Sequence, residues 1–359
     1  MNHSKMISII IPCYNVEKYV ERCFDSLIHQ TIGFDKMELI FINDASTDAT
    51  LDLLMGFEEK YPDNIIVINF QENQKQGTAR NVGMKYASTP YIAFVDADDW
   101  VEPDMYLDLT NLMQRYDCDF IECGWNYVNN NMNYHEAKYW GESRLFDLNI
   151  IEDKIEFIRS KVALVTPCDK LYKKEFLERN DIYFPERILM EDIFFVYLLF
   201  TYASSCYYTD KVYYHYYVND DGTCRQKKAD YQFDKMNVSL NYLSECMNRD
   251  IYPFNPTSEK ESVDKQSIDW MFLEKYYVYM LWEVFEEFPD KSFEVYLQMK
   301  KVINEYIPDY KNNLYRLLPG NEFDNIMIKL LEHDLDEGQL IQLRNQMLEK
   351  FRASDARDF

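Results

Sequence analysis

The sequence predicts an α/β fold, built on a mostly parallel sheet and followed by a helical C-terminal region. Two observations lead to this prediction. Over the first 130 residues, short apolar runs alternate with segments of helical periodicity, which is the pattern of repeated β-α-β units. Beyond residue 231 helical periodicity continues, interrupted mainly by prolines.

Four strands are expected in the N-terminal part, because continuous β-branched apolar runs are typical of parallel strands buried on both faces. These runs are residues 7–12, 38–44, 65–70 and 91–96. Apolar residues at helical spacing predict helices between the strands, over about 20–28, 51–57 and 78–87. Pro103 suits the first turn of a further helix, where its missing N–H costs nothing. Right-handed crossovers would place helices on both faces of the sheet.

The rest of the chain is expected to be mainly helical. Residues 150–200 are interpreted as helical, with the most apolar helix over 191–200, and the Tyr-rich run 205–218 predicts a strand or a hairpin. No repeat of fixed period follows, which favours a small helical bundle over a solenoid. We therefore expect two domains, 1–230 and 231–359.

Composition excludes several classes of function. With 38 basic and 62 acidic residues the net charge is −24, which argues against nucleic acids and anionic membrane surfaces as partners. No apolar stretch approaches the length of a membrane-spanning helix, and the apolar run at 6–12 is too short for a signal peptide. The eight cysteines form no Cys-x-x-Cys pair, which indicates free thiols in a reducing, cytoplasmic setting.

Acidic residues follow the predicted strands at the edge where parallel sheets bind ligands. Asp44 follows the second strand, and the run Asp96-Ala97-Asp98-Asp99 follows the fourth. In an extended segment, Asp96 and Asp98 project the same way. Such hard oxygen ligands suit Mg²⁺ or Mn²⁺ completed by substrate phosphates. An Asp-x-Asp pair alone, however, is more often a turn or a solvated loop.

Arg80 lies in the first turn of the third predicted helix, shortly after Gly77. Its planar guanidinium could pair with the acids at the strand ends or with a phosphate. A surface arginine on an amphipathic helix is the alternative, and the acidic neighbours disfavour it.

Four segments together resemble a known family. SIIIPCYN, LIFINDASTD, ENQKQGTARNVG and YIAFVDADDW occur in the order and spacing of inverting family-2 glycosyltransferases. The resemblance continues through DKLYKKEFLERNDIYFPE (169–186) and MEDIFF (190–195), and covers roughly residues 6–225. It implies a Rossmann-like glycosyltransferase A fold, with a nucleotide-sugar donor bound at the C-terminal edge of the sheet.

The resemblance also implies how the nucleotide is bound. Pro12 and Tyr14 would frame the uracil or another base, and Asp44 would hydrogen-bond the polar edge of that base. Glu17 matches a position near the nucleoside, and Arg80 would face the base or the diphosphate.

A divalent cation, Mn²⁺ or Mg²⁺, is implied beside the diphosphate. Asp98 would be its direct ligand, Asp96 would lie near the ribose and the metal, and Ala97 belongs to the same motif. A cation there would stabilise the negative charge that grows on the leaving nucleoside diphosphate.

Inverting transfer needs a base, because the acceptor hydroxyl loses its proton as it attacks the anomeric carbon. The pair Glu191-Asp192 matches the family's Glu-Asp motif, and Asp192 is the expected base, ahead of Glu191. Without the upstream motifs, two acids complementing a helix macrodipole would be the preferred interpretation.

Five further residues stay ambiguous. His215 could lie near the metal or be a packing residue, and Arg225 could reach the diphosphate or face solvent. Trp100, Trp125 and Trp140 could stack on sugars or belong to the core, and only Trp100 adjoins the acidic motif.

The predicted function is metal-dependent transfer of a sugar, from a donor that is most often UDP-linked in this family, to a hydroxyl of a glycan or glycoconjugate. Residues 1–128 would bind the nucleotide sugar, and 129–230 would supply the base and the acceptor site. A nucleotidyltransferase or a NAD-dependent enzyme would need glycines after the first strand, and Pro12 to Val16 contains none. The serious alternative is a catalytically silent subunit that stabilises a glycan-assembly complex.

Two expectations concern partners. A lipid-linked acceptor would bring the protein to a membrane surface without a spanning segment. The apolar segment 270–288 would pack on the catalytic half or form a homo-oligomer. Donor sugar, acceptor and linkage do not follow from the sequence.

Overall fold

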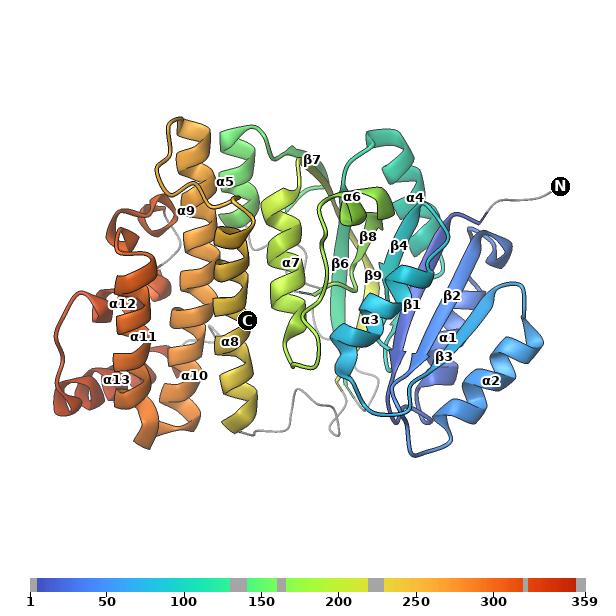
Figure 1. Ribbon diagram of the computed structural model, residues 1–359, viewed down its shortest axis with the longest axis horizontal. Coiled ribbons are helices and arrows are strands. Elements are labelled where there is room, and N and C mark those ends of the chain that lie inside the picture. Colours follow the sequence, from blue (N-terminus) through green and yellow to red (C-terminus); the bar gives the residue numbers. More distant parts are fainter. Residues whose placement is uncertain (1–4, 130–140, 160–165, 219–228, 319–321, 353–359) are drawn as a thin grey trace. The chain divides into compact units, whose positions relative to one another are not determined.

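The computed structural model describes residues 5–129, 141–159, 166–218, 229–318 and 322–352 of the 359-residue chain. The chain forms two compact units, Met1–Tyr231 and Gln232–Phe359. The first combines a sheet with helices and the second is helical (Figure 1).

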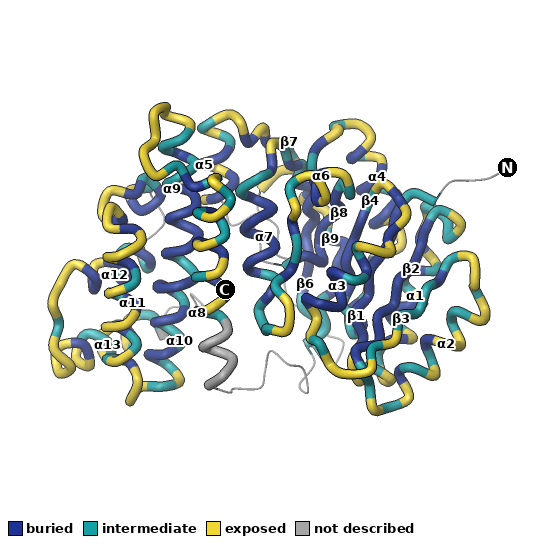
Figure 2. The backbone as a smooth tube through the Cα atoms, viewed as in Figure 1, coloured by how far each residue is buried: buried dark blue, intermediate teal, exposed yellow. Residues whose placement is uncertain are grey.

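The described part of the first unit contains a nine-stranded sheet with the order β3-β2-β1-β4-β8-β6-β9-β5, and β7 pairs with β9 outside this path. The first four strands are β1 (Ile7–Cys13), β2 (Met37–Asn43), β3 (Ile65–Asn69) and β4 (Tyr91–Phe94). They pair in parallel, as the apolar runs predicted. Every residue of β1 and β2 is buried (Figure 2).

The remaining strands extend the sheet in mixed orientation. They are β5 (Trp100–Val101), β6 (Phe120–Val128), β7 (Arg144–Asp147), β8 (Lys170–Lys173) and β9 (Ser205–Tyr217). β8 runs antiparallel to β4 and β6, whereas β6 and β9 are parallel. The Tyr-rich run is therefore one strand and not a hairpin.

The helical interpretation of residues 150–200 was wrong at β8. This strand is only four residues long and has a lysine at each end, so its sequence does not show the apolar run by which a buried strand is predicted. Lys170 is nevertheless fully buried, because its ammonium group lies 2.7 Å from Asp169 Oδ1 and 3.4 Å from Glu122 Oε2. A paired charge can enter a core that would exclude an unpaired one.

Seven α-helices accompany the sheet in the described part of the first unit. They are α1 (Val20–Ile28), α2 (Thr50–Lys60), α3 (Lys75–Tyr86), α4 (Met105–Tyr116), α5 (Ile151–Arg159), α6 (Lys174–Arg179) and α7 (Glu191–Tyr202). α3 packs closely on β1, since a Cβ on Gly83 would lie 2.4 Å from Ile10 Cγ2. Only glycine permits this approach of helix and strand.

An aromatic cluster holds α7 against the sheet. Phe195 of α7 stacks on Phe184 with ring centroids 4.0 Å apart, and both rings contact Phe94 of β4 edge-on. These contacts place the first turn of α7 near the residues that follow β4.

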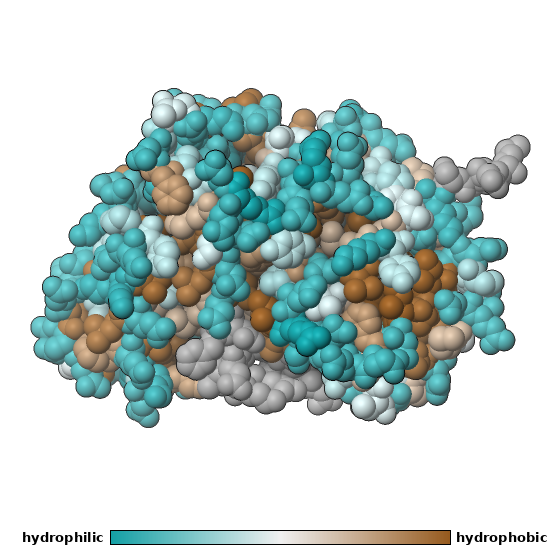
Figure 3. Space-filling model, in the orientation of Figure 1, coloured by the Kyte–Doolittle hydropathy of each residue, from teal (hydrophilic) through white to brown (hydrophobic). Residues whose placement is uncertain are grey.

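The first unit also shows apolar side chains on its surface over β1–β3, where the edge strand β3 is only half-buried at Ile66–Ile68 (Figure 3).

The second unit is a set of helices. They are α8 (Ala229–Asn248), α9 (Glu259–Leu273), α10 (Met280–Glu287), α11 (Ser292–Tyr306), α12 (Glu322–Leu331) and α13 (Glu337–Arg352). A π-helical turn, Glu274–Tyr279, joins α9 to α10. Most apolar residues of the segment 270–288 are buried, and α10 packs on α11. Across the described residues, no helix combines the length and apolar character needed to cross a membrane.

All seven cysteines in the described ranges are buried free thiols, and Cys224 lies outside these ranges. Burial raises the pKa of Cys118 to about 11 and that of Cys246 to about 12, which slows thiolate chemistry. We expect unreduced, denatured protein to show all eight thiols in a dithionitrobenzoate titration. The native protein should react slowly. Loss of two thiols from the denatured count would reveal a disulfide and contradict the prediction.

Candidate functional site

The loops that follow β1 and β2 are tied together at the C-terminal edge of the sheet. Asn15 and Ala45 both adopt left-handed backbone conformations, with φ of 53° and 58°. The Asn15 N–H donates to Ser46 Oγ over 3.0 Å, and Asn15 Oδ1 accepts from the Thr47 N–H over 2.8 Å. The two loops therefore form one preorganised surface.

Three predicted nucleotide-binding residues lie on or beside this surface. Pro12 is buried within β1, whereas Tyr14 is 49% exposed. Glu17 is exposed, and its carboxylate accepts the Ala49 N–H over 2.9 Å just before α2. Glu17 thus helps to hold the second loop, and its predicted place near a nucleoside stays a prediction.

Asp44 connects β2 with the start of α3. Its carboxylate oxygens accept the backbone N–H groups of Gln74 and Lys75 over 2.7 and 2.9 Å. Burial raises the pKa of Asp44, and these two bonds oppose that rise. They also explain why α3 begins at Lys75, three residues before the predicted start. Each oxygen retains a second lone pair, so the predicted bond to a base is still available.

Arg80 is buried in α3 and bridges two distant motifs. Its Nη2 lies 2.8 Å from Asp96 Oδ1, and its Nη1 lies 2.5 Å from Glu191 Oε1. Burial lowers the pKa of Arg80, but the two carboxylates more than compensate and keep the guanidinium charged. The alternative of a surface arginine is therefore wrong. The predicted contact of Arg80 with a base or diphosphate stays a prediction, because carboxylates hold both terminal nitrogens.

The acidic run after β4 forms a tight turn, residues 96–99, which we call the acidic turn. The Asp99 N–H donates to the Asp96 carbonyl over 3.0 Å, and Ala97 is buried between them. The side chain of Asp96 is 28% exposed, and Asp98 is also partly exposed. Asp96 and Asp98 can therefore reach a ligand at the edge of the sheet.

Asp99 turns the opposite way and is buried. Its Oδ2 accepts the Tyr214 hydroxyl over 2.5 Å, and its Oδ1 accepts the Tyr217 N–H over 2.7 Å. Burial, followed by the charges of Asp98 and Asp96, raises the pKa of Asp99 well above its usual range. The sequence alone gives neither Asp99 nor Tyr214 a role. Residues 96–99 form a turn and not the extended segment that was expected, so alternation along a strand gives no guide to where Asp99 projects.

The donor groups of the acidic turn fit a hard divalent cation. Asp96 and Asp98 offer carboxylate oxygens only, which is what Mg²⁺ or Mn²⁺ uses alongside water and phosphate oxygens. Within the described ranges, no three or more His, Cys, Asp or Glu side chains are arranged to hold a metal by themselves. The turn therefore suits a cation shared with a bound diphosphate and does not suit an all-protein metal centre.

Glu191 and Asp192 open α7 behind a left-handed residue, Met190, whose φ is 62°. Burial raises the pKa of Glu191, and Arg80 opposes that rise. Asp192 is partly exposed, and its Oδ1 accepts the Ile193 N–H over 2.9 Å. Burial and the neighbouring charge of Glu191, against the opposing charge of Arg80, raise the pKa of Asp192 to about 7.

Side chains of α3 hold the segment that leads into α7. The Asn81 amide exchanges two hydrogen bonds with the backbone of Phe184, over 2.8 and 2.9 Å. A Cβ on Gly77 would lie only 2.5 Å from the Pro185 carbonyl oxygen and 3.0 Å from Glu191 Cγ. α3 thus joins Asp44 at its start to Glu191 at its side, and brings together the residues predicted to bind a nucleotide and those predicted to supply a base.

His215 and Trp100 are packing residues in this structure. The ring nitrogens of His215 lie 2.6 Å from Asn126 Oδ1 and 2.7 Å from Glu102 Oε1, so neither is available to a metal. The Trp100 ring contacts His215, with centroids 5.2 Å apart, and the Arg22 guanidinium lies 4.1 Å from its centre. Trp125 is only 8% exposed and belongs to the core. Trp140 and Arg225 lie outside the described residues.

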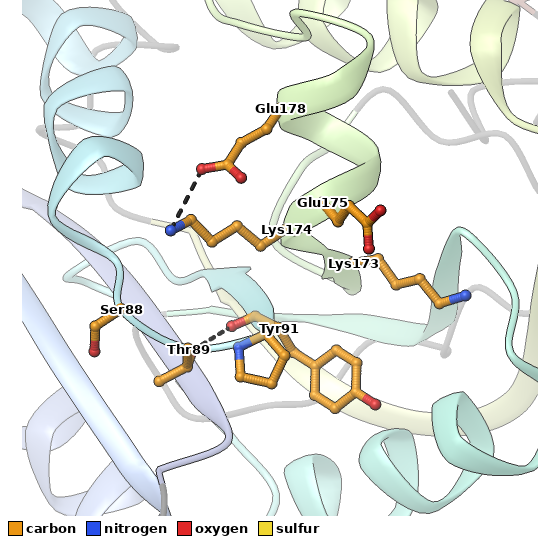
Figure 4. A pocket seen from close by; sticks show the side chains of 8 residues that line it. Ser88, Thr89, Tyr91, Lys173, Lys174, Glu175 and Glu178 are labelled. Carbon is orange, nitrogen blue, oxygen red and sulfur yellow. Dashed lines mark hydrogen bonds and ion pairs between the residues drawn. The ribbon is translucent and has the colours of Figure 1, made fainter.

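A pocket of about 330 Å³ lies at the other end of β4 (Figure 4). Its lining includes Tyr91, at the start of β4, and Lys174, whose Nζ lies 3.3 Å from Glu178 Oε1. β4 runs from this pocket towards the acidic turn. The pocket is therefore separated from the acidic turn by the length of the strand, and it contains none of the predicted site residues.

Known glycosyltransferases resemble this chain in sequence. The profile of the family described as Glycosyl transferase family 2 matches residues 8–180. The chain is 34% identical over 178 residues to Glycosyltransferase GlyA of Streptococcus pneumoniae, covering 48% of this chain and 25% of that protein. It is 31% identical over 218 residues to the poly(ribitol-phosphate) beta-glucosyltransferase of Bacillus spizizenii, covering 60% of this chain and 33% of that protein. The matches thus span a quarter to a third of these two relatives.

Solved structures show the same fold. The structure of S. aureus TarS 1–349 in complex with UDP-GlcNAc superposes with a TM-score of 0.71 at 20% identity, covering 97% of this chain and 92% of that one. This likeness confirms the expected fold class, a mostly parallel sheet with a helical C-terminal region.

Proposed function

We propose, from the match of residues 8–180 to the family described as Glycosyl transferase family 2, that the chain transfers a sugar, with inversion, from a nucleotide-sugar donor to a hydroxyl of a glycan or glycoconjugate. The double ion pair of Arg80 is the observation that carries the proposal. It joins Asp96, in the acidic turn, to Glu191, which immediately precedes Asp192. The acids predicted to hold the metal and diphosphate and the predicted base are thereby joined through one arginine, which supports their acting together.

The donor would lie at the C-terminal edge of the sheet. Pro12, Tyr14 and Asp44 would hold the base, with Glu17 near the nucleoside. Asp98 and Asp96 would hold Mn²⁺ or Mg²⁺, which when bound stabilises the negative charge of the departing nucleoside diphosphate. Preorganisation of these loops means that little ordering is needed when the donor binds.

Asp192 would accept the proton of the attacking hydroxyl. A general base works best when its pKa lies near the working pH, and the pKa of Asp192 is raised to about 7. Glu191 is already paired with Arg80, so its oxygen is committed to a hydrogen bond. Asp192 is therefore the better candidate of the two acids.

The donor is proposed to be UDP-linked. S. aureus TarS has been solved with UDP-GlcNAc and with UDP, and one relative is named a poly(ribitol-phosphate) beta-glucosyltransferase. UDP-GlcNAc and UDP-glucose are therefore the first donors to test, and a polyol-phosphate polymer is a reasonable first acceptor.

A nucleotide-release assay tests the proposal. The purified chain is incubated with a panel of UDP-, GDP- and TDP-sugars and Mn²⁺, with and without acceptor, and the free nucleotide is measured. We expect slow release of UDP from at least one UDP-sugar, accelerated by a suitable acceptor. No release from any donor, together with no detectable binding of UDP, would contradict the proposal and favour the catalytically silent subunit.

A further inference from the structure

The phenol of Tyr214 ties both ends of the acidic turn to one oxygen atom. Its hydroxyl donates to Asp99 Oδ2 over 2.5 Å and accepts the Asp96 N–H over 3.2 Å. The first and last residues of the turn are thus joined through a residue of β9 that lies more than a hundred positions later in the chain.

Two further contacts hold the same turn. The Tyr217 N–H donates to the other carboxylate oxygen of Asp99 over 2.7 Å. From the α1 side, Arg22 Nη2 donates to the Asp98 carbonyl over 2.6 Å, and its guanidinium lies 4.4 Å from the centre of the Tyr217 ring. The backbone of the turn is therefore held between β9 and α1, while the carboxylates of Asp96 and Asp98 remain partly exposed.

An irregularity in the sheet sets the position of Tyr214. The pairing of β6 with β9 shifts register on both sides of Gly124, and a Cβ on Gly124 would lie 3.1 Å from the Lys211 carbonyl oxygen. β-Bulges of this kind re-aim side chains. Here Tyr213 turns its hydroxyl to Asp108 of α4, and Tyr214 turns its own to the acidic turn.

We propose that Tyr214 is a positioning residue for the divalent cation, acting through Asp99 and the Asp96 backbone. The inference rests on the proposed function, since it concerns the cation of that reaction. Two carboxylates that share a cation repel each other when it is absent, and a turn held only by its own backbone would relax apart. The Tyr214 hydroxyl removes that freedom and fixes the backbone from which Asp96 and Asp98 project.

Replacing Tyr214 with Phe tests this role, because the change removes the hydroxyl and keeps the ring. The measurement is UDP affinity by titration calorimetry over a series of Mn²⁺ concentrations and in EDTA. We expect the Mn²⁺ concentration that half-maximally tightens UDP binding to rise about 10–100-fold, the usual effect of losing a partner of a metal ligand. UDP affinity in EDTA should stay within two-fold, and excess Mn²⁺ should restore most of the turnover.

Tyr106→Phe is the matched control. It also removes a buried phenol hydroxyl from the first unit, one that has no hydrogen-bond partner among the described residues. Its Mn²⁺ dependence should equal that of the wild type. If Tyr214→Phe does not fold, Asp99→Asn is the second variant. Asn has one acceptor oxygen and cannot accept both the Tyr214 hydroxyl and the Tyr217 N–H, so it should shift the Mn²⁺ dependence in the same direction.

Three results would overturn the inference. The first is a folded Tyr214→Phe variant whose Mn²⁺ dependence stays within two-fold of the wild type. The second is an equal loss of UDP affinity with Mn²⁺ and in EDTA, which would mark a structural role only. The third is a wild type that binds UDP without any effect of Mn²⁺. By contrast, a wild type that neither binds UDP nor releases it from a donor would overturn the proposed function itself.

Discussion

Replacing Asp192 with Asn is expected to slow sugar transfer by about 10²–10⁴-fold, the usual contribution of a general base, and to leave UDP affinity within a few-fold. Asn has nearly the same size and can still accept the Ile193 N–H through its amide oxygen. It cannot take the proton of the acceptor hydroxyl. Initial rates of transfer and calorimetric UDP affinity, measured on the same preparation, separate the two effects.

The thermal stability of Asp192→Asn should rise, although its activity falls. An acid in the first turn of a helix stabilises the fold by roughly 0.3–1 kcal/mol. For Asp192, however, burial and the charge of Glu191 disfavour the ionised form in the folded state, which is why its pKa is raised to about 7. The second effect is the larger one, so Asp192→Asn should melt at a higher temperature than the wild type at pH 8. Asp52→Asn, in the first turn of α2, is the control and should not show this gain.

The pH dependence supplies an independent readout. Below about pH 7 the folded protein carries protonated Asp192, so kcat/KM should rise as the pH increases through about 7 and then level off. Between the unfolded pKa of about 3.9 and the folded value, the native state binds the extra proton, so this contribution to stability falls as the pH rises. Asp192→Asn should lose both features. If instead it transfers sugar at nearly the wild-type rate, the base lies elsewhere and Glu191 is the next candidate.

Asp98→Asn is the second substitution with a large expected effect. It would remove an anionic ligand from the cation that stabilises the leaving diphosphate, an interaction worth several kcal/mol in the transition state, or about 10³-fold or more in turnover. EDTA should have the same effect on the wild type, and Mn²⁺ or Mg²⁺ should reverse it. Nucleotide release at saturating donor is the measurement.

The control for Asp98→Asn is Asp25→Asn, which removes one exposed acid from α1 and should leave turnover unchanged. Comparing the two variants separates loss of a metal ligand from loss of one negative charge in a chain whose net charge is −24. Sugar transfer that survives both EDTA and Asp98→Asn would contradict a metal-dependent mechanism.

The local pattern of apolar residues was sufficient to predict the four parallel strands, β1 to β4. The runs at 7–12, 38–44, 65–70 and 91–96 lie in or overlap β1 to β4. Burial on both faces demands uninterrupted apolar residues in β1 and β2, and the half-buried edge strand β3 carries the same kind of run. The same logic failed at β8, where Lys170 is buried beside the carboxylates of Asp169 and Glu122. Glu122 lies on another strand, and such a pairing leaves no periodic signal in the sequence.

By itself the sequence determined the order of these strands along the chain, the resemblance to family-2 glycosyltransferases, and which acids follow which strand. It left open what each acid does. Arg80 forms ion pairs with acids 16 and 111 positions away in the sequence. Asp99 is buried and accepts a hydrogen bond from Tyr214, 115 positions away. Only the tertiary structure decided these contacts, and with them the raised pKa of Asp192. The reason is physical: charge state depends on burial and on neighbouring charges, and both are set by which distant segments pack together.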